Sequence, residues 1–164
     1  ADRAEGDAVL NDEVRRGYDQ WAASYDAVAT LTRDLDAEVL VMKGRIGGRV
    51  LELGCGTGKN TLWLAQRAQR LVACDFSPAM LARAKERVPG VEFHLCDIRG
   101  EWPVDEVDVV VVDLVLKHVD DLRPVFAQAQ NKLESIESRP AASGRAICKR
   151  LMSIARNAGI TGRL

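Results

Sequence analysis

The sequence has no closely spaced cysteine pair, no long apolar run and no large excess of either charge. Its four cysteines include no Cys-x-x-Cys pair, which argues for reduced thiols and against a disulfide framework. No stretch approaches the roughly 18 apolar residues that a membrane-spanning helix needs, and from the first residues we expect no signal peptide. We therefore expect a cytoplasmic protein without a membrane partner.

The balance of charge also limits the choice of partners. The chain has 23 basic and 24 acidic residues and a formal net charge of −1, so its overall charge does not call for nucleic acid as a ligand. A length of 164 residues suggests one domain with a substantial core. Within it we expect an N-terminal helical cap over residues 1–45 and a ligand-binding core over residues 46–164.

The most informative stretch joins a short apolar run to three closely spaced glycines. Residues 50–53 are followed by glycines at positions 54, 56 and 58, and a helical apolar pattern begins at Thr61 and continues to residue 69. This pattern predicts a buried parallel strand, a tight turn and a helix. Glycines accept positive φ angles and let a ligand approach the backbone closely. We therefore favour a ligand-binding loop over a purely structural turn.

The spacing of these glycines separates two kinds of cofactor site. It is G-x-G-x-G, whereas the dinucleotide fingerprint is G-x-G-x-x-G. Residues 52–58, Glu-Leu-Gly-Cys-Gly-Thr-Gly, resemble the first motif of class I S-adenosylmethionine-dependent methyltransferases. The resemblance covers about residues 14–134 and implies S-adenosylmethionine as the cofactor. The residues that it assigns to the cofactor in this motif are Glu52, Gly54, Cys55, Gly56 and Gly58.

An acidic residue ends the second predicted strand, residues 71–75. Asp75 there could accept hydrogen bonds from the two vicinal hydroxyls of a ribose. An N-cap is the alternative, because Asp75 and Ser77 both precede Pro78, which suits a first helical turn. We assign the cap to Ser77 and the ribose to Asp75, and Phe76 could flank the adenine.

A second acid follows the third predicted strand, residues 91–95. The family resemblance implies that an acid at this place binds the exocyclic amine of adenine and that the backbone of the next residue contacts the ring. Asp97 and Ile98 match these two positions. A solvent-exposed turn carboxylate is the alternative for Asp97.

Aromatic residues recur near the N-terminus, where a helix is predicted over about residues 8–28. Val14, Tyr18, Trp21 and Tyr25 share one helical face, which is ordinarily a core-packing pattern. Residues 18–26 also resemble the Tyr-Asp-x-x-Ala-x-x-Tyr-Asp segment of many small-molecule methyltransferases. That resemblance implies that Tyr18 and Tyr25 lie at the cofactor or the substrate. We assign Trp21 to the core, and we expect a second helix over residues 34–43.

The β-branched run over residues 107–113 predicts a fourth strand that is buried on both faces. Asp113 ends it, at the edge where open parallel sheets bind ligands, and could meet the cofactor's ammonium group or the substrate. The family often has Ser or Asn there. Residues 114–122 resemble the segment that follows the fourth strand in the family. His118 within it could act as a general base, with a structural turn histidine as the alternative.

The C-terminal part departs from the family. An amphipathic helix is predicted over residues 121–134, but the polar stretch that follows lacks the usual glycine turn and fifth strand. Residues 146–148 could form a short fifth strand, or residues 147, 151, 154 and 158 could form one face of a helix. From residue 139 onward there are six basic residues and no acidic ones. This tail could be a solvated helix, an interaction surface or the remnant of a larger domain.

These elements predict an α/β fold with a Rossmann-like parallel sheet of order 3-2-1-4 and helices on both faces. A fifth strand could extend this sheet. The resemblance implies methyl transfer to a small-molecule acceptor, with Asp113 and His118 as candidate catalytic residues. We expect no metal site, because Cys55, Cys74 and Cys96, which end or follow predicted strands, are better explained as small buried residues. The alternative is a cofactor-binding but inactive domain that acts as a regulatory or dimerising partner, and a homodimer is possible in either case. A nicotinamide-dependent oxidoreductase is disfavoured by the glycine spacing, and the basic tail alone is weak evidence for nucleic acid.

Overall fold

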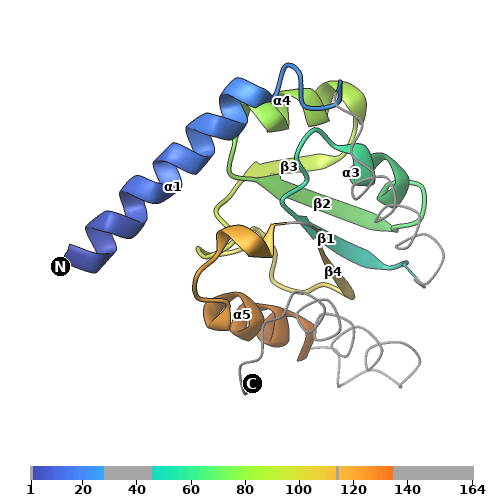
Figure 1. Ribbon diagram of the computed structural model, residues 1–164. Helices are drawn as coiled ribbons and strands as arrows, with labels where there is room; N and C mark the ends of the chain where they lie inside the picture. The colour runs from blue at the N-terminus through green and yellow to red at the C-terminus, as the bar shows by residue number, and fades with distance from the viewer. Residues whose placement is uncertain (1, 28–45, 114, 135–164) are drawn as a thin grey trace.

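The computed structural model describes residues 2–27, 46–113 and 115–134, with the side chains of the first helix described from residue 12 onward (Figure 1). The predicted helix over residues 34–43 lies outside the described residues. So does the whole segment from residue 135, for which a fifth strand and a helix were left as alternatives. In chain order the elements are α1 (Asp2–Trp21), β1 (Arg49–Leu53), α3 (Lys59–Leu64), β2 (Arg70–Asp75), α4 (Pro78–Arg87), β3 (Glu92–Leu95), β4 (Val109–Val112), the 3-10 helix η1 (Leu116–His118) and α5 (Arg123–Glu134).

The four strands form one parallel sheet in the order β3-β2-β1-β4. Leu51 of β1 lies opposite Val72 of β2 on one side and Val110 of β4 on the other. The predicted order 3-2-1-4 is therefore confirmed. In this order the carboxyl ends of all four strands meet at one edge of the sheet, so the loops that follow them are brought together.

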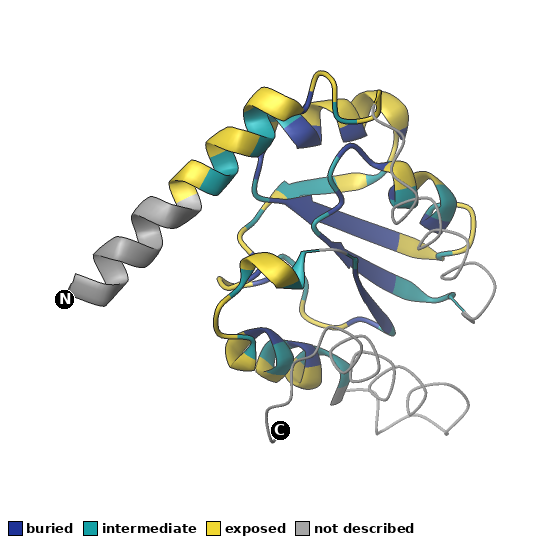
Figure 2. Ribbon diagram, in the orientation of Figure 1, coloured by how far each residue is buried: buried dark blue, intermediate teal, exposed yellow. Residues whose placement is uncertain are grey.

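Helices cover both faces of the sheet, which explains why its strands read as nearly continuous apolar runs. All four valines of β4 are buried. On one face, Val125 of α5 packs in a cluster with Leu51 and Leu53. On the other face, Leu64 of α3 packs with Val50. Figure 2 shows the resulting contrast between the largely buried strands β1, β2 and β4 and the exposed outer sides of the helices. Strand β3, at the edge of the sheet, is only partly buried.

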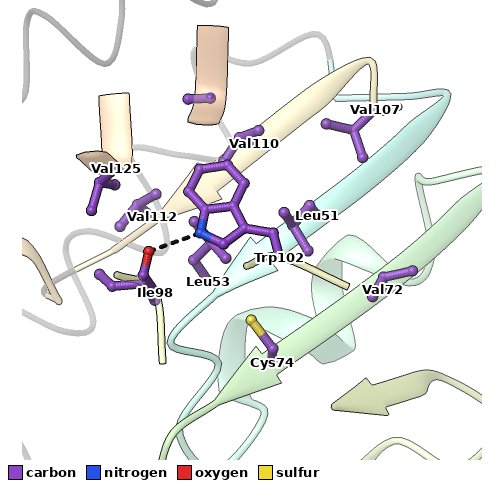
Figure 3. Close-up of a cluster of buried hydrophobic side chains, with 11 residues drawn as sticks. Leu51, Leu53, Val72, Cys74, Ile98, Trp102, Val107, Val110, Val112 and Val125 are labelled. Atoms are coloured by element: carbon purple, nitrogen blue, oxygen red, sulfur yellow. Dashed lines mark hydrogen bonds between the residues drawn. The ribbon is translucent and has the colours of Figure 1, made fainter. Parts of the chain in front are cut away.

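A tryptophan fixes the chain that follows β3 to the larger of these clusters (Figure 3). Trp102 is 2% exposed, and its Nε1 donates a hydrogen bond of 2.8 Å to the carbonyl oxygen of Ile98. The bond satisfies the polar end of a side chain that is otherwise held by apolar contacts. It also holds Ile98 in place at the carboxyl edge of the sheet.

The start of α4 follows the sequence prediction. The hydroxyl of Ser77 accepts a hydrogen bond of 3.1 Å from the backbone amide of Met80, and Pro78 occupies the first turn. Ser77 is therefore the N-cap of this helix, and the prediction that assigned it this role in preference to Asp75 is confirmed.

Two helix boundaries differ from the predictions. Helix α1 begins at Asp2 and ends at Trp21, whereas the pattern predicted residues 8–28. Helix α3 ends at Leu64 instead of continuing to residue 69. The amides of Gln69 and Arg70 both donate to the carbonyl oxygen of Gly48, so the chain has to turn before β2 can start. None of the helices described combines the length and the apolar character needed to cross a membrane.

Candidate functional site

The loops at the carboxyl edge of the sheet surround a cavity of about 220 Å³, which α1 and the turn after it close on one side. The residues that line it come from every strand end and from α1: Val14, Tyr18, Trp21, Tyr25, Gly54, Gly56, Asp75, Phe76, Met80, Cys96, Asp97, Ile98, Arg99, Asp113, Val115, Lys117, His118 and Val119. Nine of the twelve residues that the sequence assigned to a ligand, Tyr18, Tyr25, Gly54, Gly56, Asp75, Phe76, Asp97, Ile98 and Asp113, are among them, as is the catalytic candidate His118.

The glycine loop that follows β1 forms the floor of the cavity. A Cβ atom on Gly54 would overlap Cγ2 of Val115, and one on Gly58 would come within 3.0 Å of the Cα of Ala84. Gly56 differs, because a Cβ there would meet nothing within 4 Å. The first and third glycines are thus required by packing. The second leaves bare backbone facing the open space of the cavity.

Asp75 ties this loop to the end of β2. Its Oδ2 accepts a hydrogen bond of 2.8 Å from the amide of Gly56, and its Oδ1 accepts one of 2.9 Å from the amide of Ser77. The side chain is 6% exposed, and burial raises the pKa of its carboxyl group. A carboxylate offers about four acceptor positions. Asp75 therefore keeps acceptor capacity toward the cavity after both backbone bonds are made.

The end of β3 contributes a carboxylate that is already paired. Arg99 donates from Nε to Oδ1 of Asp97 at 2.9 Å and from Nη2 to Oδ2, and its backbone amide donates to Oδ1 at 3.0 Å. This pairing lowers the pKa of Asp97. Ile98, by contrast, is buried beside Trp102 and presents an apolar side chain to the cavity. Sequence reasoning gave no role to Arg99, which lines the cavity together with its partner.

In the two Tyr-Asp pairs of the N-terminal segment, the tyrosines line the cavity and the aspartates bind other parts of the protein. Tyr18 and Tyr25 line the cavity. Asp19 accepts a hydrogen bond from the Ser77 hydroxyl at 2.5 Å and lies 3.3 Å from the amide of Ala79. Each tyrosine is thus followed by an acid that fastens α1, or the turn after it, to the rest of the molecule.

Asp26 makes the second of these attachments. Its carboxylate accepts a hydrogen bond of 3.0 Å from the Thr57 hydroxyl, and it forms an ion pair with Arg87 of α4. Arg87 also donates to the carbonyl oxygen of Thr57. The turn after α1 is therefore fixed to the glycine loop and to α4 at the same time.

The assignment of Trp21 to the core is wrong. Its side chain is 43% exposed and lines the cavity, and its ring lies 4.7 Å from that of Tyr25 between centroids. The helical spacing correctly placed Val14, Tyr18 and Trp21 on one face of α1, whereas Tyr25 lies in the turn that follows this helix. That face, however, closes the cavity and does not pack onto the sheet.

The end of β4 carries the two catalytic candidates. Asp113 lines the cavity and accepts a hydrogen bond of 2.9 Å from the Asn60 side chain. Nε2 of His118 lies 2.8 Å from the hydroxyl of Tyr18, and the two rings meet edge to face. Burial lowers the pKa of the His118 imidazole, and the charge of Lys117 lowers it further. A lowered pKa favours the uncharged imidazole, which is the form in which a general base acts.

Three residues of the glycine motif do not line the cavity. The carboxyl group of Glu52 is buried and accepts a hydrogen bond of 2.6 Å from the Thr61 hydroxyl, and burial raises its pKa to about 8. Cys55 packs against Ala73 and Ala84, and Gly58 begins α3. The assignment of Glu52, Cys55 and Gly58 to the cofactor stays a prediction. Within the ranges that the structure covers, no group of acidic, cysteine or histidine side chains is placed to hold a metal ion.

Comparison with known proteins agrees with this arrangement. A family model described as "Methyltransferase domain" matches residues 50–135. Malonyl-[acyl-carrier protein] O-methyltransferase of Serratia marcescens is 32% identical over 124 residues, which cover 74% of this chain and 49% of that protein. Trans-aconitate 2-methyltransferase of Escherichia coli is 38% identical over 79 residues, which cover 47% of this chain and 31% of that protein.

Solved structures of methyltransferases also resemble this chain. A structure described as a DhpI-SAM-HEP complex aligns with a TM-score of 0.63 and 32% identity, covering 82% of this chain and 63% of that one. The N-methyltransferase NodS of Bradyrhizobium japonicum, in complex with S-adenosyl-L-homocysteine, aligns with a TM-score of 0.59. At 21% identity, this second likeness concerns the fold alone. The chain spans about half or less of the length of the two curated relatives named above.

Proposed function

The chain belongs to the methyltransferase-domain family of class I S-adenosylmethionine-dependent methyltransferases, and from this premise we propose that it transfers a methyl group from S-adenosylmethionine to a small-molecule acceptor. One observation carries the proposal. Residues that follow all four strands, together with Tyr18 of α1 and Tyr25 of the turn after it, line a single cavity. The family membership also disfavours the alternative of an inactive partner domain.

The residues of the cavity fit a nucleoside-containing cofactor. Gly56 leaves open space in front of its backbone, Phe76 and Ile98 offer apolar surfaces for a purine, and Asp75 keeps acceptor capacity for ribose hydroxyls. Asp113, at the end of β4, suits an ammonium group by charge. When bound, S-adenosylmethionine would supply a methyl group on a positively charged sulfur, together with a leaving group that needs no protonation.

The protein's own part in the reaction is to position the reactants and to exclude water. Tyr18, Trp21 and Tyr25 close the cavity from the side of α1. His118, with its lowered pKa, would accept a proton from an acceptor that has one to lose. An acceptor that is already ionised would need no base, and His118 would then only orient it through Tyr18.

The relatives support a small acceptor. The two curated relatives described above are named for malonyl-[acyl-carrier protein] and for trans-aconitate, and the proposal extends to this chain only the general class of small acceptor. A cytoplasmic location and a homodimer are further parts of the proposal. The location is supported by the free thiols of Cys55, Cys74 and Cys96.

Calorimetric titration tests the cofactor. We expect S-adenosylhomocysteine, the demethylated product, to bind one site per chain, and NAD to bind much more weakly. Gly56→Ala should weaken S-adenosylhomocysteine binding by about tenfold or more, because its methyl group enters the cavity. Gly90→Ala is the matched control: its φ angle is also positive and its Cβ also meets nothing within 4 Å, but Gly90 does not line the cavity.

Two results would contradict the proposal. One is NAD binding in preference to S-adenosylhomocysteine. The other is an equal effect of the two glycine variants on affinity, because backbone strain, which both variants share, would then explain the whole loss.

A further inference from the structure

The ionisable side chains of the cavity are unevenly distributed. At the ends of β2 and β3 the cavity has two carboxylates, Asp75 and Asp97, and the guanidinium of Arg99, which is turned onto Asp97 by hydrogen bonds from Nε and Nη2. Asp75 is likewise held by two backbone amides. The charges at this end are therefore largely committed to partners within the protein.

The cavity wall formed by η1, which follows β4, has a cation without such a commitment. Lys117 lines the cavity from η1, and its side chain is exposed. Within the described ranges 2–27, 46–113 and 115–134 it forms no ion pair or hydrogen bond. An ammonium group at the wall of a partly enclosed cavity is strongly hydrated unless an anion replaces the water.

Two hydrogen-bonding groups lie beside this lysine. The Tyr18 hydroxyl and Nε2 of His118 are 2.8 Å apart, and His118 is the next residue after Lys117. Lys117, His118 and Tyr18 all line the same cavity. A charged donor and a pair of neutral hydrogen-bonding groups thus meet at one place in the cavity wall.

We propose that Lys117 binds an anionic group of the methyl acceptor, a carboxylate or a phosphate, and so sets the acceptor class of this site. The inference rests on the proposed function, because it assumes that the β2 and β3 end of the cavity holds the methyl donor. Asp113 does not oppose it: this carboxylate is held by Asn60 and suits the donor's ammonium group. The positive sulfur of the donor would also attract an anionic acceptor.

The test uses the full chain saturated with S-adenosylhomocysteine. Succinate, its uncharged analogue succinamide, and inorganic phosphate are titrated separately by calorimetry. The wild-type protein should bind succinate or phosphate at least about tenfold more tightly than succinamide, since a hydrogen-bonded ion pair in a partly enclosed site is worth that much. The stronger of the two anions identifies the group that the site prefers.

Three variants sharpen the measurement. Lys117→Met should weaken anion binding by about tenfold, whereas Lys117→Arg, which keeps the charge, should stay close to the wild type. Lys85→Met removes an equal charge from an exposed position on α4 that does not line the cavity. It should leave anion binding unchanged, and so it controls for long-range effects of net charge.

The outcomes separate this inference from the proposed function. If S-adenosylhomocysteine itself fails to bind, the proposed function fails. If it binds but neither anion does, or if Lys117→Met binds anions as well as the wild type, only the assignment of Lys117 is overturned. If Lys117→Met loses affinity for S-adenosylhomocysteine, the lysine holds the carboxylate of the donor, and the assignment to the acceptor is likewise wrong.

Discussion

The two ends of the cavity differ in how firmly their side chains are held. At the ends of β1, β2 and β3, Asp75 is 6% exposed and bound by two backbone amides, and Ile98 is buried in the core beside Trp102. At the end formed by α1 and η1, Trp21 is 43% exposed and Lys117 is exposed. The firmly held end is suited to a ligand that never changes, and the open end to one that differs between relatives.

The largest effect is expected from a change in the floor of the firmly held end. Gly54→Ala should destabilise the protein by about 2–4 kcal/mol, because its Cβ would overlap Cγ2 of Val115 and its φ angle is 74°. Urea denaturation measures the loss. Combining it with Val115→Ala should recover part of the stability lost to Gly54→Ala. If Gly54→Ala costs as much stability in the Val115→Ala background as in the wild type, the contact between the two residues does not constrain the loop.

A smaller effect is expected where the carboxylate of β2 is replaced by an amide. Asp75→Asn should weaken S-adenosylhomocysteine binding by about 10- to 100-fold, because an amide has one acceptor oxygen where the carboxylate has two, both of which accept backbone amides. Asp113→Asn, at the other end, should cost less. Calorimetry on both variants tests the ranking, and the reverse order would mean that the ends differ in burial but not in function.

The next prediction concerns Glu52 in β1 and the dependence of the protein's stability on pH. Burial raises the pKa of Glu52 to about 8, so the folded protein holds this proton more tightly than the unfolded chain does. The stability that results is complete below the unfolded pKa and is lost as the pH rises toward 8. We expect Glu52→Gln to be more stable than the wild type at pH 8, by roughly 1–3 kcal/mol, with little difference at pH 5.

Denaturation at several pH values checks this difference. A constant difference between variant and wild type from pH 5 to pH 8 would show that Glu52 is ionised throughout this range.

The smallest effect is expected at the open end. Tyr18→Phe removes one hydrogen bond, that between its hydroxyl and His118, and should cost about 1 kcal/mol of stability or less. Affinity for S-adenosylhomocysteine should change by less than about threefold, and turnover of the acceptor should fall more than this affinity. A large loss of S-adenosylhomocysteine affinity would move Tyr18 from the acceptor side to the donor side and blur the distinction between the two ends.

The firmly held end was also the more predictable one. The glycine spacing, the acids after two strands and the Ser77 cap are all local patterns, and each reflects a backbone requirement that acts within a few residues. The order of the strands follows from general rules for parallel sheets. These elements could therefore be predicted from the chain alone.

The open end depends on contacts between residues far apart in the sequence, for which no local signal exists. Asp19 binds Ser77 across 58 positions, and Asp26 binds Arg87 across 61. Periodicity placed Trp21 on the same face as Tyr18 but could not show what that face meets. Lys117 was missed because a single lysine forms no sequence pattern, and its place in the cavity wall became visible only with the fold.

The attachment of α1 through Asp19 and Asp26 has a consequence for how such a protein could acquire new substrates. The wall that carries Tyr18 and Tyr25 is fastened to α4 and the glycine loop by two acid side chains and is not built from the sheet. This wall could therefore be exchanged: another helix with acids at the same two positions could bind over the same glycine loop. Selectivity could then diverge between descendants while the handling of the methyl donor was inherited intact.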